Sequence, residues 1–63
     1  MTQSEVTALI ETWIKEHSLF AAQVVRVTPE AHGAWGVLIE CSELIWQQRV
    51  SPAGEVSPPM WLD

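Results

Sequence analysis

The chain has 63 residues, of which 48% are hydrophobic and 17% are charged. This length allows one small domain, residues 1–63, with a thin margin of stability, because so short a chain buries only about 60% of its unfolded surface. Eight acidic residues against three basic ones give a net charge of −5. That charge disfavours binding to nucleic acids and to anionic membranes.

The single cysteine excludes an intramolecular disulfide, and one cysteine with two histidines is too few for a zinc cluster, so we expect no metal or cofactor. The first residues lack the basic and apolar stretches of a signal peptide. No segment reaches the roughly 18 apolar residues of a membrane span. These observations predict a cytoplasmic protein.

An amphipathic helix is expected over about residues 3–17. Apolar residues at helical spacing form one stripe, which consists of Val6, Leu9, Ile10, Trp13 and Ile14. Thr2 and Glu5 have the spacing of a capping box, in which each side chain accepts a hydrogen bond from the other residue's backbone N–H. Basic Lys15 and His17 suit the negative, C-terminal end of the helix dipole.

The β-branched run after the helix predicts a first strand over residues 23–28. Strict alternation assigns Val25 and Val27 to the buried face of this strand, and it assigns Val24, Arg26 and Thr28 to the opposite face. A turn containing Pro29 and Gly33 follows, so we expect the next strand to pair antiparallel with the first.

Two further strands are expected over residues 35–41 and 44–50. The apolar face of the second consists of Trp35, Val37, Ile39 and Cys41. For 44–50 the alternation favours a strand, but a helix stays open, because several side chains also have helical spacing: Val37, Leu38, Cys41, Leu44, Ile45 and Gln48. Pro58 and Pro59 predict that residues 56–63 form an extended, Pro-rich tail.

Together these elements predict an α+β fold, in which one N-terminal helix packs on a small three-stranded antiparallel sheet. The element order, with the segments "VVRVTPEAHGAWGVLIE" and "IWQQRVSPAGEV", resembles small PepSY-like α-β-β-β modules. Residues 34–40 are also similar to the G-W-x-V-x-(V/I)-E core of the gas-vesicle accessory protein O family. The resemblance implies a topology and carries over no activity and no functional residue.

Few side chains offer reactivity near neutral pH. Cys41 belongs to an apolar strand face, where a thiol usually packs as a small hydrophobe. His17 fits a helix-capping role and His32 a solvated turn, and no pair of these residues has metal-ligand spacing. Glu40 and Glu43 are expected to form a solvated rim. These observations disfavour an enzyme.

Both faces of the expected sheet carry apolar residues, and one helix can cover only one face. Trp13 and Trp35 are expected in the core, whereas Trp46 lies toward the helix or on the outer face, depending on the register of its strand. An uncovered apolar face indicates an interface, unless the tail folds back over it. The candidate interface residues are Val24, Leu38, Ile45, Trp46, Met60, Trp61 and Leu62.

The sequence therefore predicts a non-catalytic protein-interaction module or small accessory subunit. Its expected partner is a protein, and self-association as a homodimer is one form of that expectation. Two alternatives come from other classes. One is an acidic mimic of nucleic acid that binds a basic protein, which requires the carboxylates to line one surface. The other is an enzyme that depends on Cys41.

Overall fold

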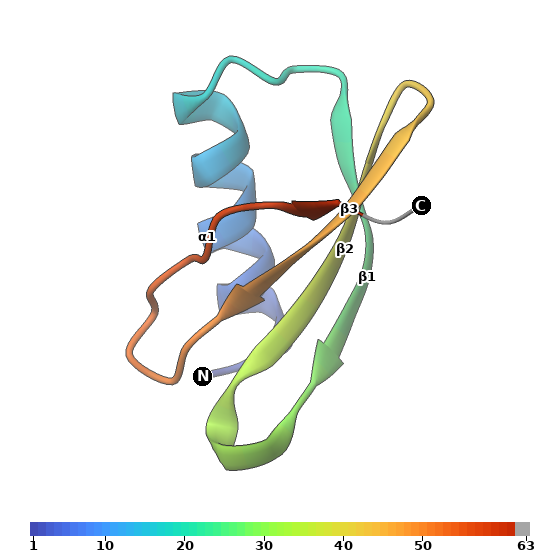
Figure 1. Ribbon diagram of the computed structural model, residues 1–63. Coiled ribbons are helices and arrows are strands. Elements are labelled where there is room, and N and C mark those ends of the chain that lie inside the picture. The colour runs from blue at the N-terminus through green and yellow to red at the C-terminus, as the bar shows by residue number, and fades with distance from the viewer. Residues whose placement is uncertain (62–63) are drawn as a thin grey trace.

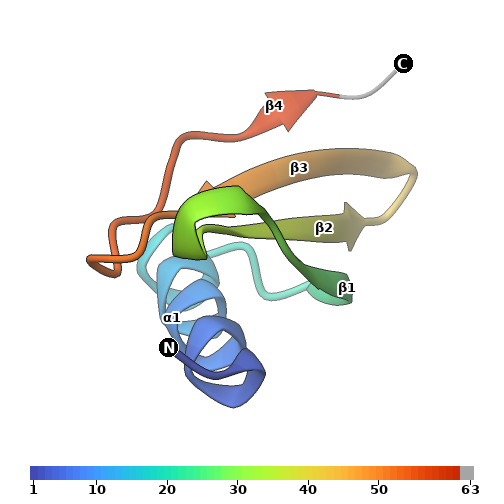
Figure 2. The ribbon, with the colours of Figure 1, turned by 90° about the horizontal axis from the view of Figure 1, so that it is seen from below.

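In the computed structural model, which describes residues 1–61, an α-helix lies on one side of an antiparallel sheet (Figure 1 and Figure 2). The elements in chain order are α1 (Gln3–Glu16), β1 (Ala22–Pro29), the short 3-10 turn η1 (Ala31–Gly33), β2 (Trp35–Cys41), β3 (Leu44–Val50) and β4 (Met60–Trp61). The strands are ordered β1-β2-β3-β4 across the sheet. The α+β class predicted from the sequence is confirmed.

The helix begins at the predicted capping box. The backbone N–H of Thr2 donates to a carboxylate oxygen of Glu5 at 2.8 Å, and the backbone N–H of Glu5 donates to the Thr2 hydroxyl at 3.2 Å. The helix ends at Glu16, where Ser18 takes the left-handed conformation with φ 56° and the chain turns away. The buried stripe of α1 consists of Val6, Ile10 and Ile14.

Strands β2 and β3 occupy the residues expected from their alternating pattern, so the helical alternative for 44–50 is excluded. They are joined by the two-residue reversal Ser42-Glu43, in which Ser42 adopts φ 56° without a glycine. Ile39 lies opposite Trp46 in this register. Both side chains are buried, which places the apolar faces of β2 and β3 together under α1.

Strand β1 departs from the predicted alternation because its register against β2 shifts between Val24 and Arg26. Val24 pairs with Ile39 and Val27 pairs with Val37, so both valines point toward α1. Val25 is the extra residue of this β-bulge and is 53% exposed. The assignment of Val25 to the buried face and of Val24 to the outer face was therefore wrong.

The sheet has four strands, where the sequence predicted three. Residues 60–61 form β4, with Met60 opposite Gln47 and Trp61 opposite Trp46. Closer to the end of β3, Val56 forms an isolated bridge with Val50. The segment 56–61 thus runs along the free edge of β3.

The core lies between α1 and the sheet and consists of Val6, Ile10, Ile14, Val37, Ile39, Trp46 and Val50. Trp13 and Trp35 pack against this cluster as partly buried residues, as predicted. One buried side chain, Gln48, is polar and 1% exposed. It accepts a hydrogen bond from the indole N–H of Trp46 at 2.8 Å and donates to the Ser57 carbonyl at 2.9 Å, so both ends of its amide are bonded.

Candidate protein interface

The outer face of the sheet, which points away from α1, carries part of the predicted interface. Register places one apolar side chain from each of β2, β3 and β4 on this face, namely Leu38, Ile45 and Met60. Ile45 and Met60 are 42% and 57% exposed, and Leu38 is half-buried. In the described part of the chain, the C-terminal segment pairs with the edge of β3, so it does not fold over these residues.

The other predicted interface residues lie elsewhere. Val24 packs against the core from β1, and Trp46 is 2% exposed within the core. Trp61 extends the sheet on the same side as Trp46, and the two rings meet edge to face with their centroids 5.3 Å apart. Leu62 lies outside the described residues. Trp46 is therefore a core residue that Trp61 partly covers.

The exposed apolar side chains of β3 and β4 gather at one corner of the sheet. This β3–β4 corner consists of Leu44, Ile45, Met60 and Trp61, which are 55%, 42%, 57% and 60% exposed. Ile45 and Met60 come from the outer face, and Leu44 and Trp61 come from the helix side. The corner therefore presents apolar surface on both faces of the same sheet edge. The alternating pattern identified Ile45 as an interface candidate. Leu44, which pairs with Cys41 at the exposed end of β3, was not among the candidates.

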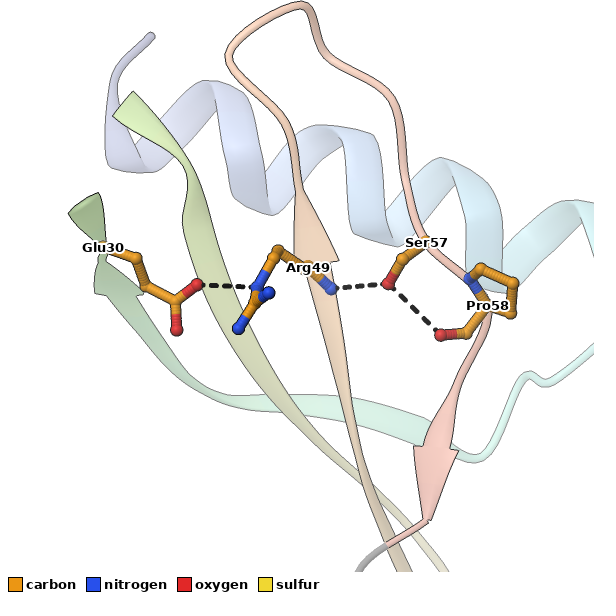
Figure 3. Close-up of polar contacts among 4 residues, drawn as sticks. All are labelled: Glu30, Arg49, Ser57 and Pro58. Carbon is orange, nitrogen blue, oxygen red and sulfur yellow. Dashed lines mark hydrogen bonds and ion pairs between the residues drawn. The ribbon is translucent and has the colours of Figure 1, made fainter. Parts of the chain in front are cut away.

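The opposite end of the outer face is polar. The guanidinium of Arg49 contacts the Glu30 carboxylate at 2.9 Å, and the Ser57 hydroxyl accepts from the Arg49 backbone N–H at 2.8 Å and donates to the Pro58 carbonyl at 3.2 Å (Figure 3). The Glu30 side chain crosses β2 at Gly36, where an added Cβ would lie 2.8 Å from a carboxylate oxygen. Gly36 thus leaves room for this ion pair.

A groove of about 820 Å³ lies between α1 and β1. The helix contributes Gln3, Thr7, Glu11, Ile14 and Lys15, and the connection and strand contribute Phe20 and residues 22–27. Phe20 is 78% exposed and Val25 is 53% exposed. This groove is not predictable from the sequence, because the alternation assigned Val25 to the core and no local pattern places Phe20 beside the helix.

The two histidines and the cysteine lie in different elements of the fold. His32 lies in η1 before β2 begins, and Cys41 ends β2, so the seven-residue strand holds them roughly 20 Å apart. The ring of His17 stacks on Trp13 with a centroid distance of 4.0 Å, and its Nδ1 lies 2.8 Å from the Trp13 carbonyl. Cys41 packs at the margin of the core.

Two further findings concern other function classes. Among residues 1–61, no three His, Cys, Asp or Glu side chains are grouped as metal ligands would be, and no helix is long and apolar enough to cross a membrane. A mimic of nucleic acid would need its glutamates on one surface. Here they come from the helix, the two ends of the sheet and the loop after β3: Glu11, Glu16, Glu30, Glu40, Glu43 and Glu55. Glu30 is also paired with Arg49.

Comparison with known proteins gave no match: no family model, no curated protein and no solved structure is significantly similar to this chain. The resemblance to PepSY-like and gas-vesicle accessory modules therefore remains a likeness of element order and short sequence patterns.

Proposed function

We propose that this chain is a non-catalytic protein-interaction module that self-associates through the β3–β4 corner. The observation that carries the proposal is the gathering of four large apolar side chains, each between 42% and 60% exposed, on two adjacent strands. Exposed apolar clusters of this kind mark protein interfaces, and tryptophan is among the residues most enriched at binding hot spots.

A second copy of the chain is the occupant that fits this corner best. Most soluble homo-oligomers are built on a two-fold axis, which brings the same patch of both copies together. The corner is apolar at its centre, and acidic Glu40 lies opposite Ile45 while Glu43 occupies the neighbouring hairpin turn. An apolar centre with a charged rim is the usual anatomy of an interface.

The positions of the glutamates, of Cys41 and of His32 support the two alternative functions less well than the exposed apolar corner supports self-association. A mimic of nucleic acid needs a continuous acidic surface, whereas the glutamates are spread over the helix, both sheet ends and a loop. A Cys41-dependent enzyme needs a base beside the thiol, whereas His32 lies at the opposite end of β2. A cytoplasmic location is part of the proposal, as the sequence predicts.

Sedimentation equilibrium across micromolar concentrations tests the self-association. The wild-type chain should approach twice 7.1 kDa as its concentration rises. Trp61→Ala and Ile45→Lys should each raise the dimer dissociation constant by tenfold or more, because a half-exposed large apolar side chain gains roughly 1 kcal/mol on burial and each copy contributes one. Ile45→Lys leaves the contact between Trp61 and Trp46 in place and sets a lysine opposite Glu40.

Phe20→Ala is the matched control, because Phe20 is more exposed than Trp61 and lies in the groove beside β1. This variant should dimerise like the wild type. A wild-type chain that stays at 7.1 kDa throughout the series, or a Phe20→Ala variant that loses dimerisation while Trp61→Ala keeps it, would show that the corner is not the interface.

A further inference from the structure

The two edges of the sheet differ in whether their backbone groups are paired. On the β3 side, the segment 56–61 closes most of the edge: Ser57 exchanges hydrogen bonds with the backbone of Arg49, and β4 pairs with Trp46 and Gln47. On the other side, within residues 1–61, β1 pairs only with β2. The outer backbone edge of β1 is therefore open, and an open edge is a template for an added strand.

The open edge of β1 borders the groove beside α1. Apolar side chains of both elements line the groove: Ile14, Ala22, Val24, Val25 and Val27, with Phe20 from the connection between them. Its volume of about 820 Å³ falls within the range of protein ligand sites. A strand added to β1 would direct alternate side chains toward this lining and toward the outer face.

The charge of the groove differs from that of the rest of the molecule. Two of the chain's three basic residues, Lys15 and Arg26, line the groove, and the third, Arg49, is paired with Glu30. In the described residues neither Lys15 nor Arg26 has a carboxylate within 4.0 Å. Glu11 is the one acidic residue of the lining. The lining thus carries a net charge of +1, two basic residues less one acidic residue, on a molecule whose net charge is −5.

We propose that this groove binds an extended acidic segment of another protein, which adds to β1 as an edge strand. Backbone hydrogen bonds to β1 would supply affinity that does not depend on sequence, and the side-chain contacts would supply selectivity. Lys15 projects from the helix side, whereas Arg26 pairs with Leu38 on the outer face. The bound segment therefore carries carboxylates on both of its faces, with apolar side chains toward Ile14 and Val27.

A second copy of this chain fits the groove less well. Antiparallel pairing of two β1 strands about a two-fold axis at Arg26 would set the two Arg26 side chains directly opposite each other on the outer face of the sheet. Like charges on neighbouring strand positions are destabilising. In such a pair the bulges of both copies would meet near the axis, whereas a regular partner strand meets only one bulge. The charge of the groove favours a partner of opposite sign.

Selection from a displayed library of random decapeptides tests this inference. Wild-type protein should enrich acidic sequences with alternating apolar residues. The double variant Lys15→Glu/Arg26→Glu should bind the synthesised peptides at least tenfold more weakly. Each lost ion pair contributes about 0.2–1 kcal/mol, and the reversed charges repel the peptide. The affinity should fall as salt is added. Amide chemical shifts should change along residues 22–29, and peptides N-methylated at alternate residues should lose binding.

Arg49→Glu is the matched control, because it reverses the third basic residue outside the groove. It should leave peptide binding within twofold of wild type, as should Trp61→Ala. Lys15→Gln/Arg26→Gln removes the positive charges without adding acids and should also weaken binding, which keeps the test valid if the double reversal unfolds the chain. If the two double variants of Lys15 and Arg26 lose peptide binding but still dimerise, the groove and the β3–β4 corner are separate binding sites.

Four outcomes of the selection, the binding measurements and the NMR experiment would overturn the inference. They are a library selection without enrichment, enriched peptides without an acidic excess, peptides that the double variant binds as well as wild type, and amide shifts confined to the β3–β4 corner. Displacement of the peptides by a single-stranded oligonucleotide of equal charge would also overturn it, because a nucleic acid has no strand backbone to pair with β1.

Discussion

Thr2 and Glu5 illustrate how two side chains define the start of α1, the one element among residues 1–61 that covers a face of the sheet. Each satisfies the other's backbone N–H, and these groups would otherwise lack a partner at the first turn of α1. Thr2→Ala should lower the free energy of unfolding by about 1 kcal/mol. Urea denaturation measures this change. Ser4→Ala, in the same exposed turn, is the control and should change it by less than about 0.5 kcal/mol.

The same pair predicts a pH dependence. The backbone N–H of Thr2, and then its hydroxyl, lower the pKa of Glu5 below its usual range, because both favour the charged carboxylate. The stabilisation is therefore present above the pKa of Glu5 in the unfolded chain and is lost as the pH falls through the lower pKa of the folded chain. An NMR titration should give Glu5 a lower pKa in the native protein than in urea. Equal values would contradict the capping box.

At the scale of elements, a buried amide side chain joins the segment before β4 to the core. Gln48 holds the Trp46 indole with its oxygen and the Ser57 carbonyl with its nitrogen. This arrangement connects residues 56–61 to the core, and the described part of β4 has two residues. The local sequence around Pro58 and Pro59 has no strand pattern, so we expect the tertiary contacts of Gln48 and Ser57 to help hold β4 against β3.

Gln48→Leu should detach this segment. The variant leaves the buried indole N–H of Trp46 without its acceptor, which costs about 1–3 kcal/mol, and it releases the carbonyl of Ser57. Hydrogen exchange should show faster exchange of the Trp46 indole N–H and of the amides of residues 57–61. Gln47→Leu, the same change on the outer face, should leave both unchanged. Retained protection in Gln48→Leu would mean that strand pairing alone holds β4.

The elements differ in how far the sequence predicts them. The helix and the strands β2 and β3 follow from local periodicity, because their buried residues recur at helical or alternating spacing. The bulge in β1 does not, since valines at 24, 25 and 27 fit the buried face in more than one register. Three residues of the β3–β4 corner, Ile45, Met60 and Trp61, are interface candidates from the sequence, whereas Leu44 is not. The meeting of β4 with β3 is not predictable from local pattern, because Pro58 and Pro59 precede β4.

At the scale of the whole molecule, 63 residues provide one helix for one face of the sheet, and the two edges must be protected in other ways. The edge of β3 is closed by the chain itself, through residues 56–61. The edge of β1 stays open and carries a bulge and Arg26, both of which discourage pairing with another β1 strand. In the two proposals above, the open edge of β1 serves a charged partner and the apolar corner serves self-association.

Deletion of Val25 tests the role of the bulge in this arrangement. Without the extra residue, Val24 and Arg26 become neighbours and the strand alternates regularly, with Val24 and Val27 still toward α1. The fold should persist, because Val25 is 53% exposed and lies outside the core. The straightened edge should now pair with other copies, so the variant should form larger, concentration-dependent assemblies.

The deletion is best made in the Trp61→Ala background, where the proposed dimer is already weakened. Light scattering should then detect assemblies in the deletion variant and monomers in Trp61→Ala alone. Val25→Thr, which keeps the bulge and the size of the side chain, is the control and should remain monomeric. A deletion variant that folds, as judged by its amide spectrum, and stays monomeric would contradict this expectation. Arg26 and the charge of the groove would then suffice to protect the edge, and the bulge would serve only to turn Val27 inward.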